Sequence, residues 1–169
     1  MIFVVKVYLA GPFFDKFGIE ARRVAQVKAV LSCNETVDTI FSPKDEDVTD
    51  PVISQLTFMS AEWQQAVFEH DLEGLLAADV LVVIADSETN MNGSDDGTAF
   101  EVGYWYAMNQ VQQQANGATP KPVVLLAQST DKLNLMLAKA TTYFTQNLLD
   151  LRRLDFNQIP QRDFVGEVN

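Results

Sequence analysis

Short, continuously apolar segments alternate along the chain with longer segments in which apolar residues recur every three or four positions. The first pattern is typical of strands buried on both faces of a sheet, and the second of helices that bury one side. Strands are predicted over residues 2–10, 37–42, 80–85, 121–127 and 141–145. Helices are predicted over 17–32, within 54–78 (continuous or broken), and over 99–114, 134–139 and 146–154.

This alternation of strands and helices predicts right-handed crossovers and a parallel sheet with helices on both faces. The fold class is therefore α/β: a doubly wound, flavodoxin-like, five-stranded sheet. No internal repeat or linker divides the chain, so one domain over 1–169 is expected. Residues 43–51 are interpreted as a polar loop and residues 155–169 as an irregular tail.

The charge balance narrows the range of partners. The chain has 12 basic and 23 acidic residues, a formal net charge of -11, which argues against nucleic acid and anionic membrane surfaces. One cysteine allows no internal disulfide. The first residues lack a signal-peptide pattern, and no apolar run approaches the ~20 residues of a membrane span. A soluble cytoplasmic protein is predicted.

Carboxylates gather where the strand over 80–85 leads into the next helix. Asp95, Asp96 and Glu101 follow that strand, at the sheet edge where ligands bind in open α/β folds. Glu101 is expected near the first helical turn, where backbone amides and the helix dipole would lower its pKa. Such a carboxylate can attack a sugar carbon; compensation of the dipole is the alternative. Gly97 permits a tight loop, and Gly103 is expected to allow close helix–sheet contact.

Other residues are expected at the same edge. One of the two adjacent aspartates, Asp95 or Asp96, is expected to cap the helix while the other faces the ligand. Tyr8 ends the first strand, where its hydroxyl can orient a carboxylate. Phe13 and Phe14 can stack against a planar base, with core packing as the alternative.

Several other chemistries find no support in the sequence. His70 is the sole histidine and there is no cysteine cluster, which argues against zinc. No serine lies on a nucleophile elbow, and no glycine-rich phosphate loop is present. The acidic stretch 45–50 is more typical of a solvated surface than of a magnesium site.

Five separated segments resemble the nucleoside 2-deoxyribosyltransferase family in order and spacing. They are Val7-Tyr8-Leu9-Ala10-Gly11-Pro12-Phe13-Phe14, Asp71-Leu72-Glu73-Gly74, Ala78-Asp79-Val80, Asp95-Asp96-Gly97-Thr98-Ala99-Phe100-Glu101-Val102-Gly103 and Leu133-Asn134-Leu135-Met136. The resemblance covers nearly the whole chain. The aspartate-rich block combined with Asn-Leu-Met is its most specific part.

The resemblance implies a transferase that exchanges the base of a 2′-deoxynucleoside, in nucleoside salvage, by a ping-pong mechanism. Glu101 would attack C1′ and form a covalent deoxyribosyl-enzyme, which a second base would resolve with overall retention. Tyr8 would hold Glu101 in position. Asp95 and Asp71 would handle the base, one of them donating a proton to its ring nitrogen.

The resemblance also implies a substrate-binding set and a form of assembly. The substrate-binding positions are Gly11, Phe13, Phe14, Asp96 and Asn134, with Phe14 lining the deoxyribose. Asn134 would reach a neighbouring subunit's site, so a homo-oligomer, commonly a hexamer, is expected. The partners would be 2′-deoxynucleosides and free nucleobases, without metal or cofactor. The Asp95–Asp96 pair resembles the purine-preferring members.

Two features depart from the family pattern. Asp71 falls inside a predicted helix, about 9 Å from an end at Ala77 given a rise of ~1.5 Å per residue; it reaches the site only if that helix breaks or crosses beside it. The sequence ends in Gly166-Glu167-Val168-Asn169, where family members usually carry an aromatic residue. The alternatives are a hydrolase of deoxynucleosides or their 5′-monophosphates, and a non-catalytic nucleoside-binding module.

Overall fold

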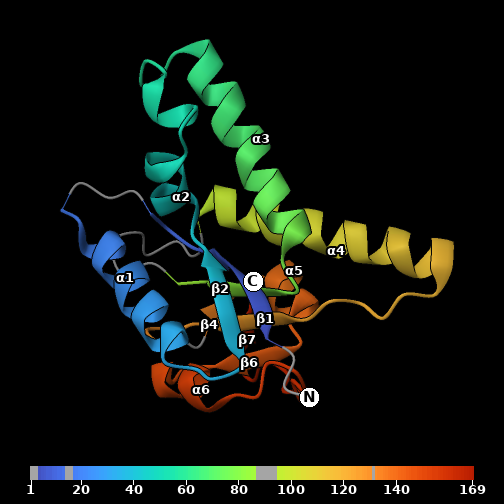
Figure 1. Ribbon diagram of the computed structural model, residues 1–169. Coiled ribbons are helices and arrows are strands. Elements are labelled where there is room, and N and C mark those ends of the chain that lie inside the picture. The colour runs from blue at the N-terminus through green and yellow to red at the C-terminus, as the bar shows by residue number, and fades with distance from the viewer. Residues whose placement is uncertain (1–3, 14–16, 87–94, 131) are drawn as a thin grey trace.

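A parallel sheet of five strands forms the centre of the molecule (Figure 1). The computed structural model describes residues 4–13, 17–86, 95–130 and 132–169. The strand order is β2-β1-β3-β4-β6, which is the flavodoxin-like arrangement. The strands are β1 (Val5–Ala10), β2 (Val37–Phe41), β3 (Val80–Ile84), β4 (Val123–Leu126) and β6 (Tyr143–Thr145). The predicted fold class is confirmed.

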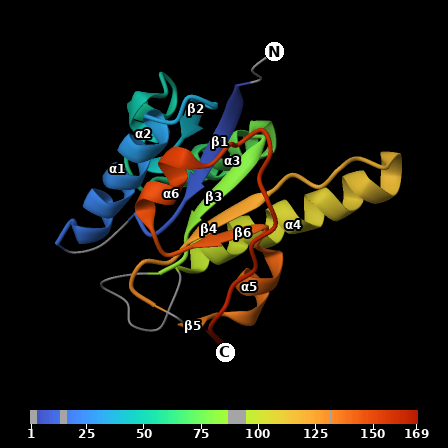
Figure 2. The same cartoon turned by 90° about the horizontal axis from the view of Figure 1, so that it is seen from below.

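Helices cover both faces of this sheet (Figure 2). On one face lie α1 (Ile19–Ser32) and α6 (Leu148–Arg153), and their Val27, Leu31 and Leu151 belong to one core. On the other face lie α3 (Ala61–Ala77), α4 (Asp96–Asn116) and α5 (Leu135–Ala140). These three helices contribute to a second core with Leu75, Trp105 and Leu137. The sheet therefore has two separate apolar layers, as a doubly wound fold requires.

The alternation of side chains along β1 decides which helices Tyr8 meets. Val7 and Leu9 belong to the core under α1, whereas Tyr8 and Ala10 belong to the core under α3 and α4. Successive side chains of a strand point to opposite faces. Tyr8 is fully buried, and it faces the helix that carries Glu101.

Residues 43–51 are not the polar loop expected from their composition. They form α2 (Pro43–Thr49), which begins with a proline after Ser42 and carries Asp45 and Glu46 in its first turn. Proline fits the first helical position because its missing N–H would have no helical partner there, and acidic residues complement the dipole. These start signals outweigh the polar composition.

A short 3-10 helix, η1 (Ile53–Gln55), and a break separate α2 from α3. The Ser60 hydroxyl then starts α3 by accepting a hydrogen bond from the backbone N–H of Trp63. The long predicted helix within 54–78 is thus broken at its beginning. α2 and α3 together form an arm that extends beyond the edge of the sheet (Figure 1).

α4 ends two residues beyond the predicted range 99–114, at Asn116, because Gly117 then adopts a left-handed backbone with φ 70°. The tail is more ordered than predicted: β7 (Glu167–Val168) pairs with β5 (Lys132–Leu133), and Tyr143 bridges to Arg162. Among the described residues, no helix is both long and apolar enough to cross a bilayer.

Candidate active site

A cavity of about 730 Å³ opens where β1 ends, between the α2–α3 arm and the start of α4. One part of its lining is acidic, with Asp47, Asp71, Asp95 and Glu101. The rest is largely apolar or aromatic and includes Phe13, Ile53, Leu56, Phe58, Met59, Trp63 and Val67. A planar apolar ligand with a few polar atoms suits such a lining.

Glu101 and Tyr8 form a direct contact at the base of this cavity. The Tyr8 hydroxyl donates a hydrogen bond to Oε1 of Glu101 over 2.5 Å. Phe41 stacks on the Tyr8 ring, with centroids 5.2 Å apart and planes 11° apart. Burial raises the pKa of Tyr8 above its usual range, and the negative charge of Glu101 raises it further. Tyr8 is therefore a neutral donor that holds one oxygen of Glu101.

The expected low pKa of Glu101 is wrong. Burial raises it to about 7, the Tyr8 hydrogen bond opposes that rise, and the charge of Asp95 adds to it. Glu101 is the sixth residue of α4, which begins at Asp96. It lies beyond the first turn, where the dipole and free amides act. Desolvation therefore decides the pKa of this carboxyl.

Asp71 reaches the cavity because α3, which ends at Ala77, crosses beside it. Gly74 permits the close approach: a Cβ there would lie 2.5 Å from ring carbons of Phe41. Burial raises the pKa of Asp71 to about 7, with contributions from the charges of Asp47 and Glu101. Its Oδ1 is buried without a hydrogen-bond partner in the described part of the molecule.

Asp95 carries both roles that had been divided between two aspartates. Its Oδ2 caps α4 by accepting hydrogen bonds from the backbone N–H and the hydroxyl of Thr98, over 3.1 and 3.3 Å. It also lines the cavity with Glu101. Asp96 is exposed and lines a second cavity on the other side of α4. The expectation that one aspartate would cap and the other face the ligand is therefore wrong.

Asn134 also lies in the second cavity, which measures about 720 Å³. There its side chain caps α5 by accepting a hydrogen bond from the backbone N–H of Met136 over 2.9 Å. The same cavity is lined by Tyr106 and Asn169. Asn134 and Asp96 are thus brought together with each other, but not with Glu101 of the same chain.

Three predicted binding residues remain. Gly11 and Phe13 line the cavity of Glu101, whereas Phe14 lies outside the described residues. A Cβ on Gly11 would lie 3.1 Å from Cβ of Ile84, so the chain turns tightly over β3 there. The close helix–sheet contact expected at Gly103 is wrong, because a Cβ on that exposed glycine would meet nothing within 4 Å.

Comparison with known proteins gives this geometry its context. The family model described as nucleoside 2-deoxyribosyltransferase matches residues 7–149. The chain belongs to this family. A nucleoside deoxyribosyltransferase of Limosilactobacillus fermentum is 30% identical over 162 residues, which span 90% of this chain and 86% of that protein. The transferase class predicted from the sequence is thus confirmed at the level of the family.

Solved structures agree with this assignment. The 2-deoxyribosyltransferase from the psychrotolerant bacterium Bacillus psychrosaccharolyticus matches with a TM-score of 0.75 and 28% identity, covering 95% of this chain and 99% of that one. A conserved protein from Enterococcus faecalis V583 matches with a TM-score of 0.51 and 20% identity, over 89% of this chain and 87% of that one. The second likeness shows the fold alone.

Two further parts of the candidate site of this nucleoside 2-deoxyribosyltransferase were not predicted from the sequence. One is the apolar arm, in which Phe58 and Trp63 meet edge to face at 4.9 Å. The other is the pair Asp47 and His70, whose Oδ1 and Nδ1 lie 3.3 Å apart. Asp47 was assigned to a solvated loop, and only the proline and acidic start signals of α2 could have placed it on a helix.

A buried polar network supports the same edge of the sheet under α1. Arg23 donates to Oδ1 of Asp86 over 2.7 Å and to its carbonyl oxygen over 2.9 Å. Oδ2 of Asp86 accepts from the backbone N–H of Ser129 over 2.7 Å. Burial raises the pKa of Asp86, but the bonds from Ser129 and Arg23 outweigh it and hold the value below its usual range. This network ties the segment after β3 to the segment after β4.

No three His, Cys, Asp or Glu side chains gather in a way that could hold a metal ion within the described ranges.

Proposed function

We propose that this chain exchanges the base of 2′-deoxynucleosides through a covalent deoxyribosyl–Glu101 intermediate. The observation that carries the proposal is the 2.5 Å hydrogen bond from Tyr8 to Glu101 inside a cavity that also holds Asp71 and Asp95. A carboxylate fixed through one oxygen presents the other to a substrate carbon. This arrangement suits nucleophilic displacement at a sugar C1′.

The first displacement breaks the bond between C1′ and the base nitrogen. A Glu101 oxygen forms a bond to C1′ while the electron pair of the broken bond moves onto the base. A proton delivered to a ring nitrogen then lets the base leave neutral. The products are a free base and a deoxyribosyl ester of Glu101.

The second displacement reverses these events with another base. Its ring nitrogen attacks C1′, the ester bond breaks, and its electron pair returns to Glu101. The proton of the incoming base passes to the residue that donated one before. Two inversions at C1′ give overall retention.

Asp71 is the better of the two candidates for carrying this proton. Its pKa of about 7 allows it to give and accept a proton near neutrality. Asp95, in contrast, is engaged by Thr98 as the cap of α4. In this mechanism Asp95 orients the base from the cavity lining through its negative charge and does not transfer the proton.

Asn134 fits a role in a neighbouring subunit's site. It lies in the second cavity beside Met136, a residue that is 75% exposed. A homo-oligomer in which this surface completes the cavity of another chain follows from the family resemblance, commonly as a hexamer. The cytoplasmic location stays a prediction.

The apolar arm favours transfer over hydrolysis. Ile53, Phe58, Met59 and Trp63 line much of the cavity, and a lining of this kind holds few ordered waters next to a reactive ester. A base can displace the ester because it stacks on such a surface. Hydrolysis of deoxynucleosides or of their monophosphates is therefore the second candidate.

The first experiment is chromatography of products after the protein is mixed with 2′-deoxyinosine and adenine. Formation of 2′-deoxyadenosine is expected, and none should form when adenine is omitted. Release of hypoxanthine and deoxyribose without exchange would instead establish the hydrolase. Absence of any turnover, also with pyrimidine donors and monophosphates, would support a binding module.

The intermediate is tested by mass spectrometry of protein quenched after incubation with 2′-deoxyinosine alone. One deoxyribosyl group is expected on the peptide that contains Glu101. The Glu101→Gln variant should lack this adduct and lose exchange by at least about a thousandfold, in the range for removal of a nucleophile. Glu73→Gln, at an exposed position of α3, is the matched control and should behave as wild type.

A further inference from the structure

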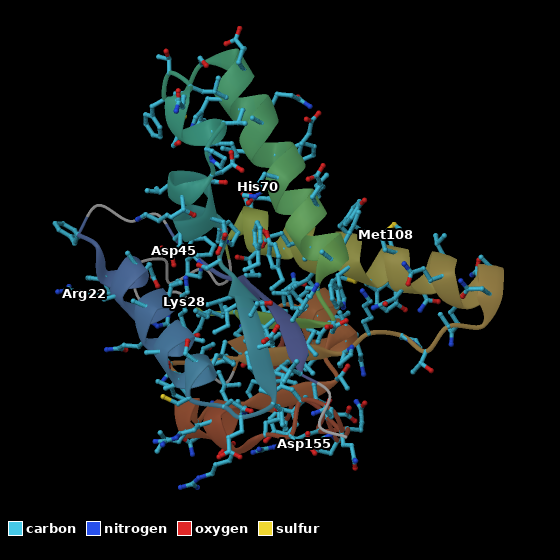
Figure 3. The ribbon with its side chains drawn as sticks, in the orientation of Figure 1. Arg22, Lys28, Asp45, His70, Met108 and Asp155 are labelled. Atoms are coloured by element: carbon cyan, nitrogen blue, oxygen red, sulfur yellow. The ribbon has the colours of Figure 1, made fainter. Side chains whose placement is uncertain are left out.

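His70, the sole histidine of the chain, contacts both Asp47 in the cavity lining and Phe41, which stacks on Tyr8. His70 lies on α3 at the junction with α2 (Figure 3). Its Nδ1 is 3.3 Å from Oδ1 of Asp47 on α2. Its ring stands edge-on to Phe41, with centroids 5.2 Å apart, and Phe41 stacks on Tyr8. Three elements, α2, α3 and β2, therefore meet at this imidazole.

Asp47 lines the cavity in which the base would lie, and its side chain is only 14% exposed. With Oδ1 held by His70, Oδ2 is the atom of this carboxyl that can accept a hydrogen bond from a ligand. The charged groups near His70 include Asp47 on α2, Asp50 directly after that helix and Asp71 on its own helix. The cation Lys44 of α2 lines the same cavity. β2 contributes the uncharged Phe41.

We propose that Asp47 selects the nucleobase and that His70 is its positioning residue, so that the cavity favours bases with an exocyclic amino group over bases with a carbonyl at the same place. The inference rests on the proposed function, since it assigns a substrate preference to the same cavity. It concerns the base, whereas Glu101 and Tyr8 act on the sugar.

The selection follows from hydrogen-bond chemistry. An ionised carboxylate can only accept, so it bonds an amino group and repels a carbonyl oxygen. A protonated carboxyl can donate to that carbonyl, and the preference is then lost. Adenine and hypoxanthine differ in this way at one position of the same ring system. A base that leaves a buried polar group of the site unpaired is rejected more strongly than a base that only changes apolar contacts.

His70 is needed because Asp47 lies in surroundings that favour its neutral form. Burial raises the pKa of Asp47, and the charges of Asp50 and Glu46 raise it further. The contact with His70 opposes this rise. The imidazole therefore fixes the direction of the carboxyl and favours its ionised, accepting form.

The test compares adenine and hypoxanthine as acceptors with 2′-deoxyguanosine as the common donor. The ratio of their kcat/KM values is the readout, because a purely structural defect lowers both values together. Wild type should prefer adenine by at least about tenfold, which corresponds to ~1.4 kcal/mol and matches one hydrogen bond to a charged group. Asp47→Asn should bring the ratio to within about threefold of unity, because its amide both donates and accepts.

Two substitutions of His70 separate positioning from packing. His70→Leu should lower the ratio severalfold at pH 7. As the pH falls, this variant should lose its preference for adenine at a higher pH than wild type does, because His70 no longer lowers the pKa of Asp47. His70→Asn, whose amide can donate to Asp47 from the place of Nδ1, should restore the ratio. Asp45→Asn is the control, because Asp45 lies on the same helix with its side chain 53% exposed and pairs with Lys28. It should leave the ratio unchanged.

Calorimetric binding of free adenine and free hypoxanthine separates failure of this inference from failure of the proposed function. If wild type does not exchange bases but binds adenine selectively, and Asp47→Asn loses that selectivity, the inference stands without the transferase. If exchange proceeds and Asp47→Asn leaves the acceptor ratio unchanged, the inference is overturned while the transferase stands. If His70→Leu does not fold, the Asp47→Asn result decides alone.

Discussion

Glu101 and Asp71 lie in the same cavity, and burial raises the pKa of each to about 7. The charge of Glu101 also contributes to the rise at Asp71. Two interacting carboxyls of similar pKa hold about one proton between them near neutrality. The proposed mechanism needs that state, because the nucleophile must be ionised while the residue that serves the departing base must carry a proton.

The raised pKa of Asp71 predicts a cost in stability that depends on pH. The folded value of about 7 exceeds the ordinary value of 3.8. The cost is therefore absent below the unfolded pKa, grows as the pH rises, and is complete above the folded pKa. Asp71→Asn should be more stable than wild type by ~1–2 kcal/mol at pH 8 and by less at pH 5.

Urea denaturation at the two pH values measures this difference. Asp38→Asn, at an exposed position of β2, removes the same formal charge without altering a buried group and should show no such pH dependence. An Asp71→Asn variant with equal gains at both pH values would contradict the assigned ionisation.

At the scale of the helix, Gly74 lets α3 pack closely against Phe41 next to Asp71. Adding a methyl at Gly74 places it 2.5 Å from the Phe41 ring, which is itself packed against Tyr8 and His70. Either α3 must move away or the ring must turn. Gly74→Ala should therefore cost ~1–3 kcal/mol of stability and should lower base exchange by moving Asp71.

Thermal unfolding and exchange kinetics of Gly74→Ala test this expectation. Gly103→Ala is the control for stability, because a Cβ there meets nothing within 4 Å and alanine is the better helix former. It should unfold at the same temperature as wild type or higher. A Gly74→Ala protein as stable and as active as wild type would show that the close approach has no consequence.

Elements with continuous apolar runs were predictable from the sequence, whereas α2 was not. The buried strands β3 and β4 lie within the apolar runs that predicted them, and Gly117 ends α4 as its residue type implied. α2 was missed because its sequence is too short and polar to show an apolar face. Only its proline and its acidic first turn distinguish it from a loop. Helix α3 was foreseen, but not its path beside the glutamate.

The sequence predicted which residues form the site better than it predicted their pKa values. Tyr8 and Glu101 were expected at one edge of the sheet, although 93 positions separate them. The pKa of Glu101 was not predictable, since it depends on burial that the whole fold creates. The contact between Asp47 and His70 depends on how α2 packs on α3, and no local pattern in the sequence encodes that packing.

At the scale of the whole molecule, α4 separates two cavities of similar size, and the predicted binding residues divide between them. A shared site across subunits predicts complementation. Glu101→Ala and Asn134→Ala proteins should each be weakly active or inactive alone. Mixed subunits that exchange should regain up to about a quarter of wild-type activity in a paired arrangement, because one site in four then carries neither substitution.

Exchange kinetics after the two proteins are unfolded and refolded together measure this recovery. Refolded wild type provides the upper limit, and each variant refolded alone provides the lower one. No recovery, despite mixed oligomers detected by differently tagged chains, would place Asn134 and Glu101 outside a common site.

The first turns of α4 present residues alternately to the two cavities. Gly97, Thr98 and Glu101 line one cavity, whereas Asp96, Ala99 and Gly103 line the other. A mutational library restricted to the second set would sample the surface around Asn134 while retaining Glu101 and Asp95, the cap of α4. A library of the first set would sample the cavity of Glu101 and leave the surface around Asn134 unchanged. The helical repeat thus offers protein engineers two nearly separable sets of positions within eight consecutive residues, 96–103.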